Sequence, residues 1–335
     1  MKPERFPHVI SMNLLTKIIA SIRYPQSAIG RTLQRSVPIL LLVPIFLLTI
    51  SGLVLYQIMV PPRMLETVNP ANFMMAGFRT LNFSSGTYNF EGWLIPSLRQ
   101  APVIILCHGY KSNRSELLTL AATLQENGYN LFLLDFRGHG SNPAKATTLG
   151  IRETADMLEA VKMLAGRAEL NPNRLGIWGA GMGAYIALST SVRSIRIKAM
   201  VIDSAYESPS QFVADQTPLV AGVDIFILKK FTLLGLSLVT LGDPERSSLR
   251  LLDSLESLQG RPKLFITNEQ EPELENQTKT LFNRAPFPKE IQSMKSSGTG
   301  LLYGSDRKRY EVQVLDFFKT NLPIRGSVQP PPPPL

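Results

Sequence analysis

Short apolar runs alternate with amphipathic stretches from about residue 79 onward. Runs such as 102–107 and 130–136 are apolar at nearly every position, which is typical of strands buried on both faces of a parallel sheet. The stretch 151–164 repeats apolar residues at helical spacing, and the alternation of the two kinds of element predicts a mostly parallel sheet with helices on both faces. The expected strands are 79–83, 87–95, 102–107, 130–136, a run beginning at 175, 198–203, 263–267 and 290–295, and the expected helices are 115–126, 151–164, a helix after 183 and 310–321.

The region 204–261 interrupts this alternation, and we expect it to form a helical cap inserted into the domain. Its segment 219–241 is apolar enough to be considered as a second transmembrane span. Asp224, Lys229 and Lys230 interrupt that segment, and a charge near the middle of a span costs about 2.5–3.5 kcal/mol on insertion scales. A pair of cap helices over a pocket is therefore the better interpretation.

The segment 37–60 is long and apolar enough to cross a membrane. It holds no charged residue, and at about 1.5 Å per residue its helix would cover the roughly 30 Å hydrocarbon core. The alternative is a cleavable signal peptide. However, the arm before the segment is long, the apolar run exceeds the usual 7–15 residues or so, and no small-residue cleavage site follows. We therefore expect an uncleaved transmembrane anchor at 37–60.

The net charge of +9 is unevenly distributed. Residues 1–36 hold six basic residues and one acidic residue, a net charge of +5, which leaves +4 for the rest of the chain. No stretch interleaves lysine and arginine with aromatic residues as single-strand binders do, so no nucleic-acid partner is expected. The positive-inside rule places the N-terminus in the cytoplasm and the domain at 61–325 outside the cell membrane.

Two terminal segments flank these parts. The basic arm 1–36 carries apolar residues at helical spacing over 14–22, which indicates either an interfacial helix on the inner leaflet or a basic tail that only sets topology. The tail 326–335 contains a run of prolines that favours polyproline II and can dock an aromatic groove. A solvated spacer is the favoured interpretation of so short a run.

Four motifs occur in order along the chain. The first is the leading strand 90–96. The other three each follow an apolar run, and they are His108-Gly109-Tyr110 after 102–107, Arg137-Gly138-His139-Gly140-Ser141 after 130–136, and Gly179-Ala180-Gly181-Met182-Gly183 after the run at 175. Together they resemble the α/β-hydrolase superfamily, in particular its serine-peptidase-like and esterase-like branch, over about residues 69–322. The resemblance implies the α/β-hydrolase fold and a catalytic triad in the order nucleophile, acid, histidine.

The nucleophile position of that triad holds a glycine. The resemblance places Gly181 in the serine position of the elbow motif G-x-S-x-G, and glycine has no nucleophilic side chain. The histidine position near Gly300 and Leu301 also lacks its group, because no histidine follows His139 in the sequence. Of the other histidines, His8 lies across the membrane from the domain, and His108 and His139 match positions that shape loops rather than the base. We therefore read the triad as degenerate.

The acid position has two candidates. Glu271 follows the 263–267 run where the resemblance places the acid, but it is also one of several glutamates in what reads as an acidic surface loop. Asp203 ends the preceding run, although an aspartate beside Ser204 often only caps a turn.

The anion-stabilising part of the site does not depend on side chains. By the resemblance, the backbone amides of Tyr110 and Met182 form the oxyanion hole, with Met182 at a helix N-terminus. Such a hole can equally bind a carboxylate or phosphate. Cys107, the single cysteine, lies in an apolar run and is expected to be an inert core residue. No metal and no cofactor are expected.

Three functions remain open from the sequence. The favoured hypothesis is a membrane-anchored pseudohydrolase that binds a small molecule or a protein without serine chemistry. The second is a working hydrolase that uses Ser204 or Ser112 with His139, so the sequence leaves enzyme activity undecided. The third is a scaffold that presents the cap and the proline tail to a partner.

Overall fold

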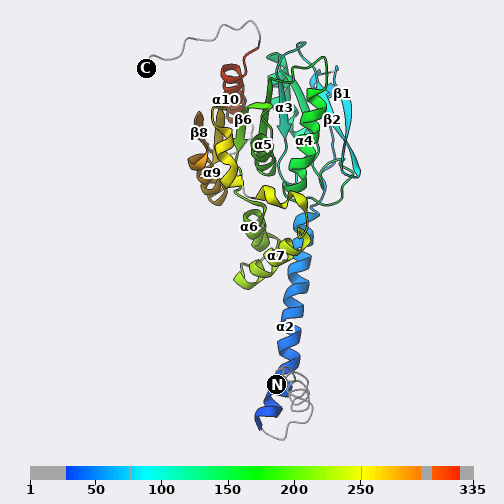
Figure 1. Ribbon diagram of the computed structural model, residues 1–335, viewed down its shortest axis with the longest axis vertical. Coiled ribbons are helices and arrows are strands. Elements are labelled where there is room, and N and C mark those ends of the chain that lie inside the picture. Colours follow the sequence, from blue (N-terminus) through cyan, green and yellow to red (C-terminus); the bar gives the residue numbers. More distant parts are fainter. Residues whose placement is uncertain (1–27, 76, 250, 296–303, 325–335) are drawn as a thin grey trace, which may run out of the picture.

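The structure is a computed structural model that describes residues 28–75, 77–249, 251–295 and 304–324 (Figure 1). Within these residues, eight strands form one sheet in the order β1-β2-β4-β3-β5-β6-β7-β8. β2 is antiparallel to both β1 and β4, and all other neighbours are parallel, as the hydrophobic pattern predicts. The strands are β1 (Arg79–Ser85), β2 (Tyr88–Ile95), β3 (Val103–Cys107), β4 (Asn130–Leu134), β5 (Leu175–Ala180), β6 (Ile197–Asp203), β7 (Lys263–Asn268) and β8 (Lys289–Met294).

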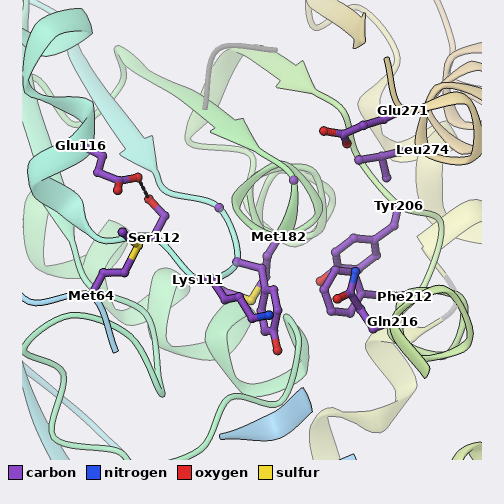
Figure 2. A pocket seen from close by; sticks show the side chains of 13 residues that line it. Met64, Lys111, Ser112, Glu116, Met182, Tyr206, Phe212, Gln216, Glu271 and Leu274 are labelled. Atoms are coloured by element: carbon purple, nitrogen blue, oxygen red, sulfur yellow. Dashed lines mark hydrogen bonds between the residues drawn. The ribbon is translucent and has the colours of Figure 1, made fainter. Parts of the chain in front are cut away.

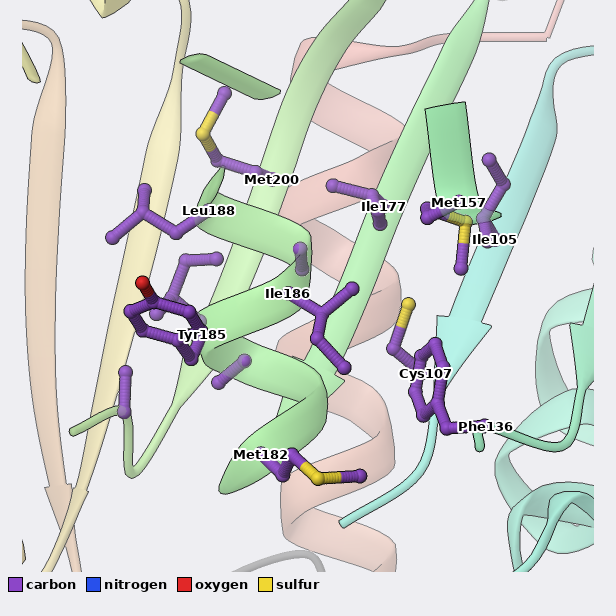
Figure 3. Close-up of a cluster of buried hydrophobic side chains, with 14 of the residues drawn as sticks. Ile105, Cys107, Phe136, Met157, Ile177, Met182, Tyr185, Ile186, Leu188 and Met200 are labelled. Atoms are coloured by element: carbon purple, nitrogen blue, oxygen red, sulfur yellow. The ribbon is translucent and has the colours of Figure 1, made fainter. Parts of the chain in front are cut away.

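Helices cover both faces of this sheet. The strands β3, β4 and β5 are buried at every position, because both of their faces lie under helices. One face packs against α4 (Ile151–Ala165), α5 (Met182–Arg193) and α9 (Pro272–Arg284), and the other packs against α3 (Leu118–Glu126) and α10 (Gly304–Asn321). Figure 3 shows the first face, where Ile186 of α5 lies among side chains of β3, β5 and β6.

A long helix, α2 (Ala28–Met59), projects from one end of the domain (Figure 1). Its 32 residues extend about 48 Å at 1.5 Å per residue. Among the described residues it is the one helix that passes a test of length and composition for a membrane span, with a mean hydropathy of 2.1 over Leu42–Met59. Side chains such as Leu42 and Phe46 are exposed, whereas Leu55 and Ile58 near its end are buried in the core.

The end of α2 is attached to the domain by polar contacts as well. The amide of Thr147 donates to the carbonyl of Met59 (2.8 Å). Arg63, just after the helix, donates to the carbonyls of Asn142 (2.6 Å) and Ala144 (2.5 Å). These contacts therefore fix the end of α2 to the domain.

The region 204–261 contains a helical hairpin, α6 (Pro209–Ala221) and α7 (Phe226–Val239). Both helices pack against α2 beside the point where it leaves the domain (Figure 1). Shorter helices return the chain to the sheet, and they are η3 (Pro244–Leu249), α8 (Leu251–Ser254) and η4 (Leu255–Leu258). Before the sheet and after β3 lie η1 (Pro70–Phe73) and η2 (Arg114–Leu117).

One expectation about local structure is wrong. The glutamates after β7 were expected to lie in an acidic surface loop, but Glu273 and Glu275 belong to the first turn of α9. Pro272 suits the first position of a helix, and negative side chains there interact favourably with the helix dipole. The helix expected at 310–321 also begins earlier, at Gly304. Most of the arm 1–36, and the whole of the tail 326–335, lie outside the described residues.

Candidate functional site

Gly181 lies at a sharp turn between β5 and α5. Its backbone has φ +56° and ψ −115°, a combination that side-chain-bearing residues adopt only under strain. The amide of Gly181 donates to the carbonyl of Asp203 (2.9 Å), and the Gly181 carbonyl accepts from Ala184 (3.1 Å) and Tyr185 (3.2 Å). The chain therefore makes the strand–turn–helix geometry of a nucleophile elbow without a nucleophile.

The three glycines of this turn are present for different reasons. A Cβ on Gly179 would collide with the backbone of Gly183, and a Cβ on Gly183 would collide with the carbonyl oxygens of Cys107 and His108. A Cβ on Gly181 would meet only the Cα of Gly109, at 4.0 Å. The packing thus requires the two outer glycines, while the space beside Gly181 can hold a side chain that this sequence does not supply.

That space belongs to a pocket of about 510 Å³ at the ends of β3 and β5 (Figure 2). Its size lies in the ordinary range of small-molecule sites, which is roughly 300–1,000 Å³. The walls come from the loop after β3 (109–112), the elbow (181–182), α6 (Phe212 and Gln216) and the start of α9 (Glu271 and Leu274). Figure 2 shows Phe212 and Gln216 on the side opposite Ser112.

Tyr110 and Met182, the two expected oxyanion-hole residues, both line this pocket. Met182 is the first residue of α5, so its amide has no acceptor within the helix and lies at the positive end of the helix dipole. The Tyr110 hydroxyl donates to the carbonyl of Ile58 in the last turn of α2 (2.8 Å). Burial raises the pKa of Tyr110 to about 12. The loop that carries this amide is thereby held against the end of α2.

The two acid candidates lie in different surroundings. Glu271 lines the pocket, and its carboxylate accepts a hydrogen bond from Asn268 at the end of β7 (3.1 Å). Asp203 is fully buried, and its carboxylate accepts from Ser204 (2.8 Å) and from the Tyr310 hydroxyl (2.7 Å). Only Glu271 is therefore placed to act on a ligand in the pocket. The histidine position near Gly300 and Leu301 lies outside the described residues.

His108 and His139 are buried among backbone groups. The neutral imidazole of His108 satisfies both nitrogens, because Nδ1 donates to the Gly109 carbonyl (2.8 Å) and Nε2 accepts from the Phe136 amide (3.0 Å). His139 Nδ1 donates to the Arg137 carbonyl (2.8 Å). Burial is the main cause that lowers the pKa of each histidine to about 4, so both are neutral near pH 7. Neither histidine lines the pocket.

The two serines that were considered as substitute nucleophiles are bonded to carboxylates. Ser112 lines the pocket and donates to Glu116 (2.6 Å), as the dashed line in Figure 2 shows. Ser204 is buried and donates to Asp203. In the part of the chain that the structure describes, neither hydroxyl is hydrogen-bonded to a histidine, so neither has the base that activation requires.

The ion pairs that a buried arginine, Arg114, makes behind the loop were not predicted from the sequence. Arg114 forms ion pairs with Glu66 (2.8 Å), Glu91 (2.5 Å) and Asp135 (3.5 Å), and its guanidinium lies over the ring of Trp93 at 4.1 Å. Burial, and then the neighbouring Asp135, raise the pKa of Glu66 to about 7. These contacts attach the segment after α2 to the loop that carries Tyr110. No short motif marks them, since the four partners lie on three separate segments of the chain: Glu91 and Trp93 on β2, Glu66 after α2, and Asp135 after β4.

Cys107 lies in β3 with its side chain fully buried in the hydrophobic cluster that Figure 3 shows. Burial raises the pKa of its thiol. A thiol in that state is a poor nucleophile. Among the described residues, no group of three or more histidine, cysteine, aspartate or glutamate side chains is arranged to hold a metal ion.

Comparison with known proteins gives one family model and several curated relatives that match part of the chain. Residues 99–241 match the family model described as serine aminopeptidase, S33, a stretch that includes the elbow, the oxyanion loop and the hairpin α6–α7. An uncharacterized protein of Mycobacterium tuberculosis is 30% identical over 129 residues, which are 38% of this chain and 45% of that protein. The chain therefore spans about half the length of this curated relative.

Solved structures resemble a larger part of the chain. Esterase Pf2001 from Pyrococcus furiosus has a TM-score of 0.59 and 20% sequence identity, and the match covers 78% of this chain and 99% of the esterase. An acylaminoacyl peptidase from Pyrococcus horikoshii has a TM-score of 0.54 and 18% identity, covering 75% of this chain and 42% of the peptidase. These likenesses show the fold and confirm the α/β-hydrolase fold expected from the motifs.

Proposed function

We propose that this chain, a member of the α/β-hydrolase superfamily, is a membrane-anchored pseudohydrolase that binds a ligand beside Gly181. The main support for this proposal is the backbone conformation of the elbow at Gly181. This elbow keeps the conformation that would present a nucleophile and leaves room for a side chain, yet the residue is glycine. A second loss agrees with this interpretation, because no histidine follows His139 to serve as the base.

The pocket suits a ligand with one polar end. The amides of Tyr110 and Met182 would receive a carbonyl, carboxylate or phosphate oxygen at the start of α5. Lys111 adds a positive charge at the same wall, while Phe212 and Leu274 provide apolar surface for the remainder of the ligand. An anionic head with an apolar body is therefore the ligand chemistry that we propose.

Membrane anchoring by α2 forms part of the same proposal. The charge-free stretch 37–60 is long enough to cross a bilayer, and six basic residues precede it. The positive-inside rule then favours a cytoplasmic N-terminus and a domain outside the cell membrane.

The two other functions that the sequence left open have less support. A working hydrolase would need a base next to Ser112 or Ser204, but both hydroxyls are held by carboxylates and the two described histidines of the domain are neutral, buried and bonded to backbone. A pure scaffold does not require an open pocket, and the open pocket beside Gly181 favours ligand binding instead.

Catalytic competence is tested on the purified full chain in detergent. We expect no labelling by a fluorophosphonate probe and no hydrolysis of p-nitrophenyl esters, because both the hydroxyl at residue 181 and the base are missing. Stoichiometric labelling of any serine would overturn the pseudohydrolase proposal.

Ligand binding is tested with decanoate, which carries a carboxylate and an apolar chain. A ligand that binds only the folded state stabilises it by RT ln(1 + L/Kd), where L is the free ligand concentration, so the melting temperature should rise with the decanoate concentration. The variant Gln216→Trp fills the pocket from α6 and should abolish this shift. The control Gln211→Trp changes an exposed residue of the same helix and should retain it. A shift that survives Gln216→Trp would place binding elsewhere, and no shift would favour the scaffold.

A further inference from the structure

The helix α7 exposes an unusually apolar face. Ile227, Leu234 and Leu238 lie along one side of it at helical spacing, and all three are exposed, with Leu238 at 59%. Phe226 at its first turn is 71% exposed. A soluble surface helix normally presents charged and polar residues on its outer side. The outer side of α7 is instead suited to an apolar partner.

The inner side of the same helix is already occupied. Leu228, Thr232 and Leu236 form a buried stripe on α7. Gly235 brings the helix close to α2, since even a Cβ at this position would lie 3.1 Å from the Leu55 side chain. The exposed face of α7 is therefore held in a fixed position beside α2, which exposes apolar side chains such as Phe46 and Leu53.

The depth at which α7 meets α2 can be counted along α2. A hydrocarbon core of roughly 30 Å requires about 20 helical residues. Arg35 is the last charged residue before the apolar stretch, and the helix is continuous from there to Met59. Twenty residues beyond Arg35 is Leu55, the residue that faces Gly235. The C-terminal half of α7, around Gly235, thus lies at the level where the bilayer would end on the outer side.

We propose that the outer face of α7 lies in the outer surface of the lipid bilayer, beside the span formed by α2. The inference rests on the membrane-anchoring part of the proposed function. α7 has 14 residues, or about 21 Å, so it is too short to span a bilayer and fits an interfacial position.

The charged groups of this region are compatible with that position. Lys229 is paired with Asp224 at 2.8 Å, and the ammonium group of Lys230 lies over the Phe226 ring at 5.2 Å. Lysines at the boundary can extend their ammonium groups to the headgroups while their aliphatic stems lie on apolar surface. A bilayer is favoured over a second protein copy because it covers the exposed apolar sides of α2 and α7 together.

The position of α6 gives this contact a functional consequence. α6 packs against α7 and also supplies Phe212 and Gln216 to the pocket wall. The pocket beside Gly181 then lies one helix away from the membrane surface. An amphiphile with an anionic head would move from the outer leaflet to the pocket over a short distance.

The test uses single introduced cysteines in the full chain, reconstituted in phosphatidylcholine vesicles. The native Cys107 is fully buried and does not interfere. Leu234→Cys and Leu238→Cys report on α7, and Leu48→Cys reports on α2. Ile195→Cys is the control, because this 80% exposed residue lies between α5 and β6, at the opposite end of the sheet from the pocket. Each cysteine carries a nitrobenzoxadiazole label, and quenching is measured with doxyl-labelled lipids and with aqueous iodide.

We expect doxyl lipids to quench the labels at residues 48, 234 and 238, and iodide to quench only the label at 195. Doxyl quenching of the label at 48 without quenching of the labels at 234 and 238 would overturn the inference about α7. It would leave the proposed transmembrane role of α2 supported. Protection of 234 and 238 from both quenchers would mean that a protein covers α7, which also overturns it. Loss of doxyl quenching at 48 as well would refute the anchor itself, and the inference with it.

Discussion

Replacing Gly181 with serine tests whether the turn is a nucleophile elbow that has lost its side chain. With φ +56° and ψ −115°, a non-glycine residue at this position should cost about 1–3 kcal/mol of folding free energy. Steric collision adds nothing, since the nearest heavy atom to the new Cβ is 4.0 Å away. In a domain of this size about 1 kcal/mol lowers the melting temperature by roughly 2–4 °C, so Gly181→Ser should melt about 2–12 °C lower.

The assay is thermal unfolding of the full chain in detergent, followed by circular dichroism. Gly86→Ser is the matched control, because Gly86 has φ +57° and open space but lies in the β1–β2 turn and does not line the pocket. Gly179→Ser should lose more stability than Gly181→Ser, since its Cβ collides with backbone. Gly181→Ser should also show no ester hydrolysis, because no histidine is available to activate the hydroxyl. A melting temperature equal to or above that of the wild type would refute the elbow assignment.

Three further results are expected. First, the pKa values of His108 and His139 are lowered to about 4 from an ordinary value of 6.5. The contribution of the two neutral histidines to the free energy of unfolding is therefore complete above pH 6.5 and is lost as the pH falls through about 4. The free energy of unfolding should fall by up to about 1.4 kcal/mol per pH unit for each histidine. The raised pKa of Glu66 has the opposite effect, because it stabilises the folded protein as the pH falls. Melting temperatures measured from neutral to acid pH should therefore fall more steeply in Glu66→Gln than in the wild type. A melting temperature that does not change with pH would contradict the buried, neutral state of the two histidines. Second, a maleimide should label Cys107 only after denaturation, and labelling of the native protein would show that the thiol is accessible. Third, alkaline phosphatase fused after Leu335 should be active and the protein should resist alkaline extraction, whereas release of a shortened soluble form would indicate a cleaved signal peptide.

Local sequence patterns predicted the central elements well. The apolar runs that form β3, β4 and β5 are buried along their whole length. Each run could therefore be predicted as a strand from its own sequence, with no knowledge of which strands lie beside it. The prediction of secondary structure failed at α9, where polar and charged residues dominate the sequence. α9 begins with Glu273 and Glu275, and its polar composition concealed an amphipathic helix whose Leu281 reaches the core.

The candidate site was only partly predictable. The residues singled out from the motifs, Gly181, Tyr110, Met182 and Glu271, all line one pocket, because the carboxyl ends of parallel strands meet at one edge of a sheet. The sequence did not distinguish Glu271 from Asp203, since both follow strands. Only the packing of α10, which brings Tyr310 to Asp203, separates a pocket carboxylate from a structural one.

The sequence by itself determined what is missing and how the strands are ordered along the chain. A serine at residue 181 and a late histidine are absent whatever the fold, and continuous apolar runs produce buried strands through local patterning. The tertiary structure alone decided that the space beside Gly181 is open, that Tyr110 is bonded to the end of α2, and that Gly235 lies against Leu55. These features depend on distances between residues far apart in sequence, which are set by the packing of whole helices against the sheet.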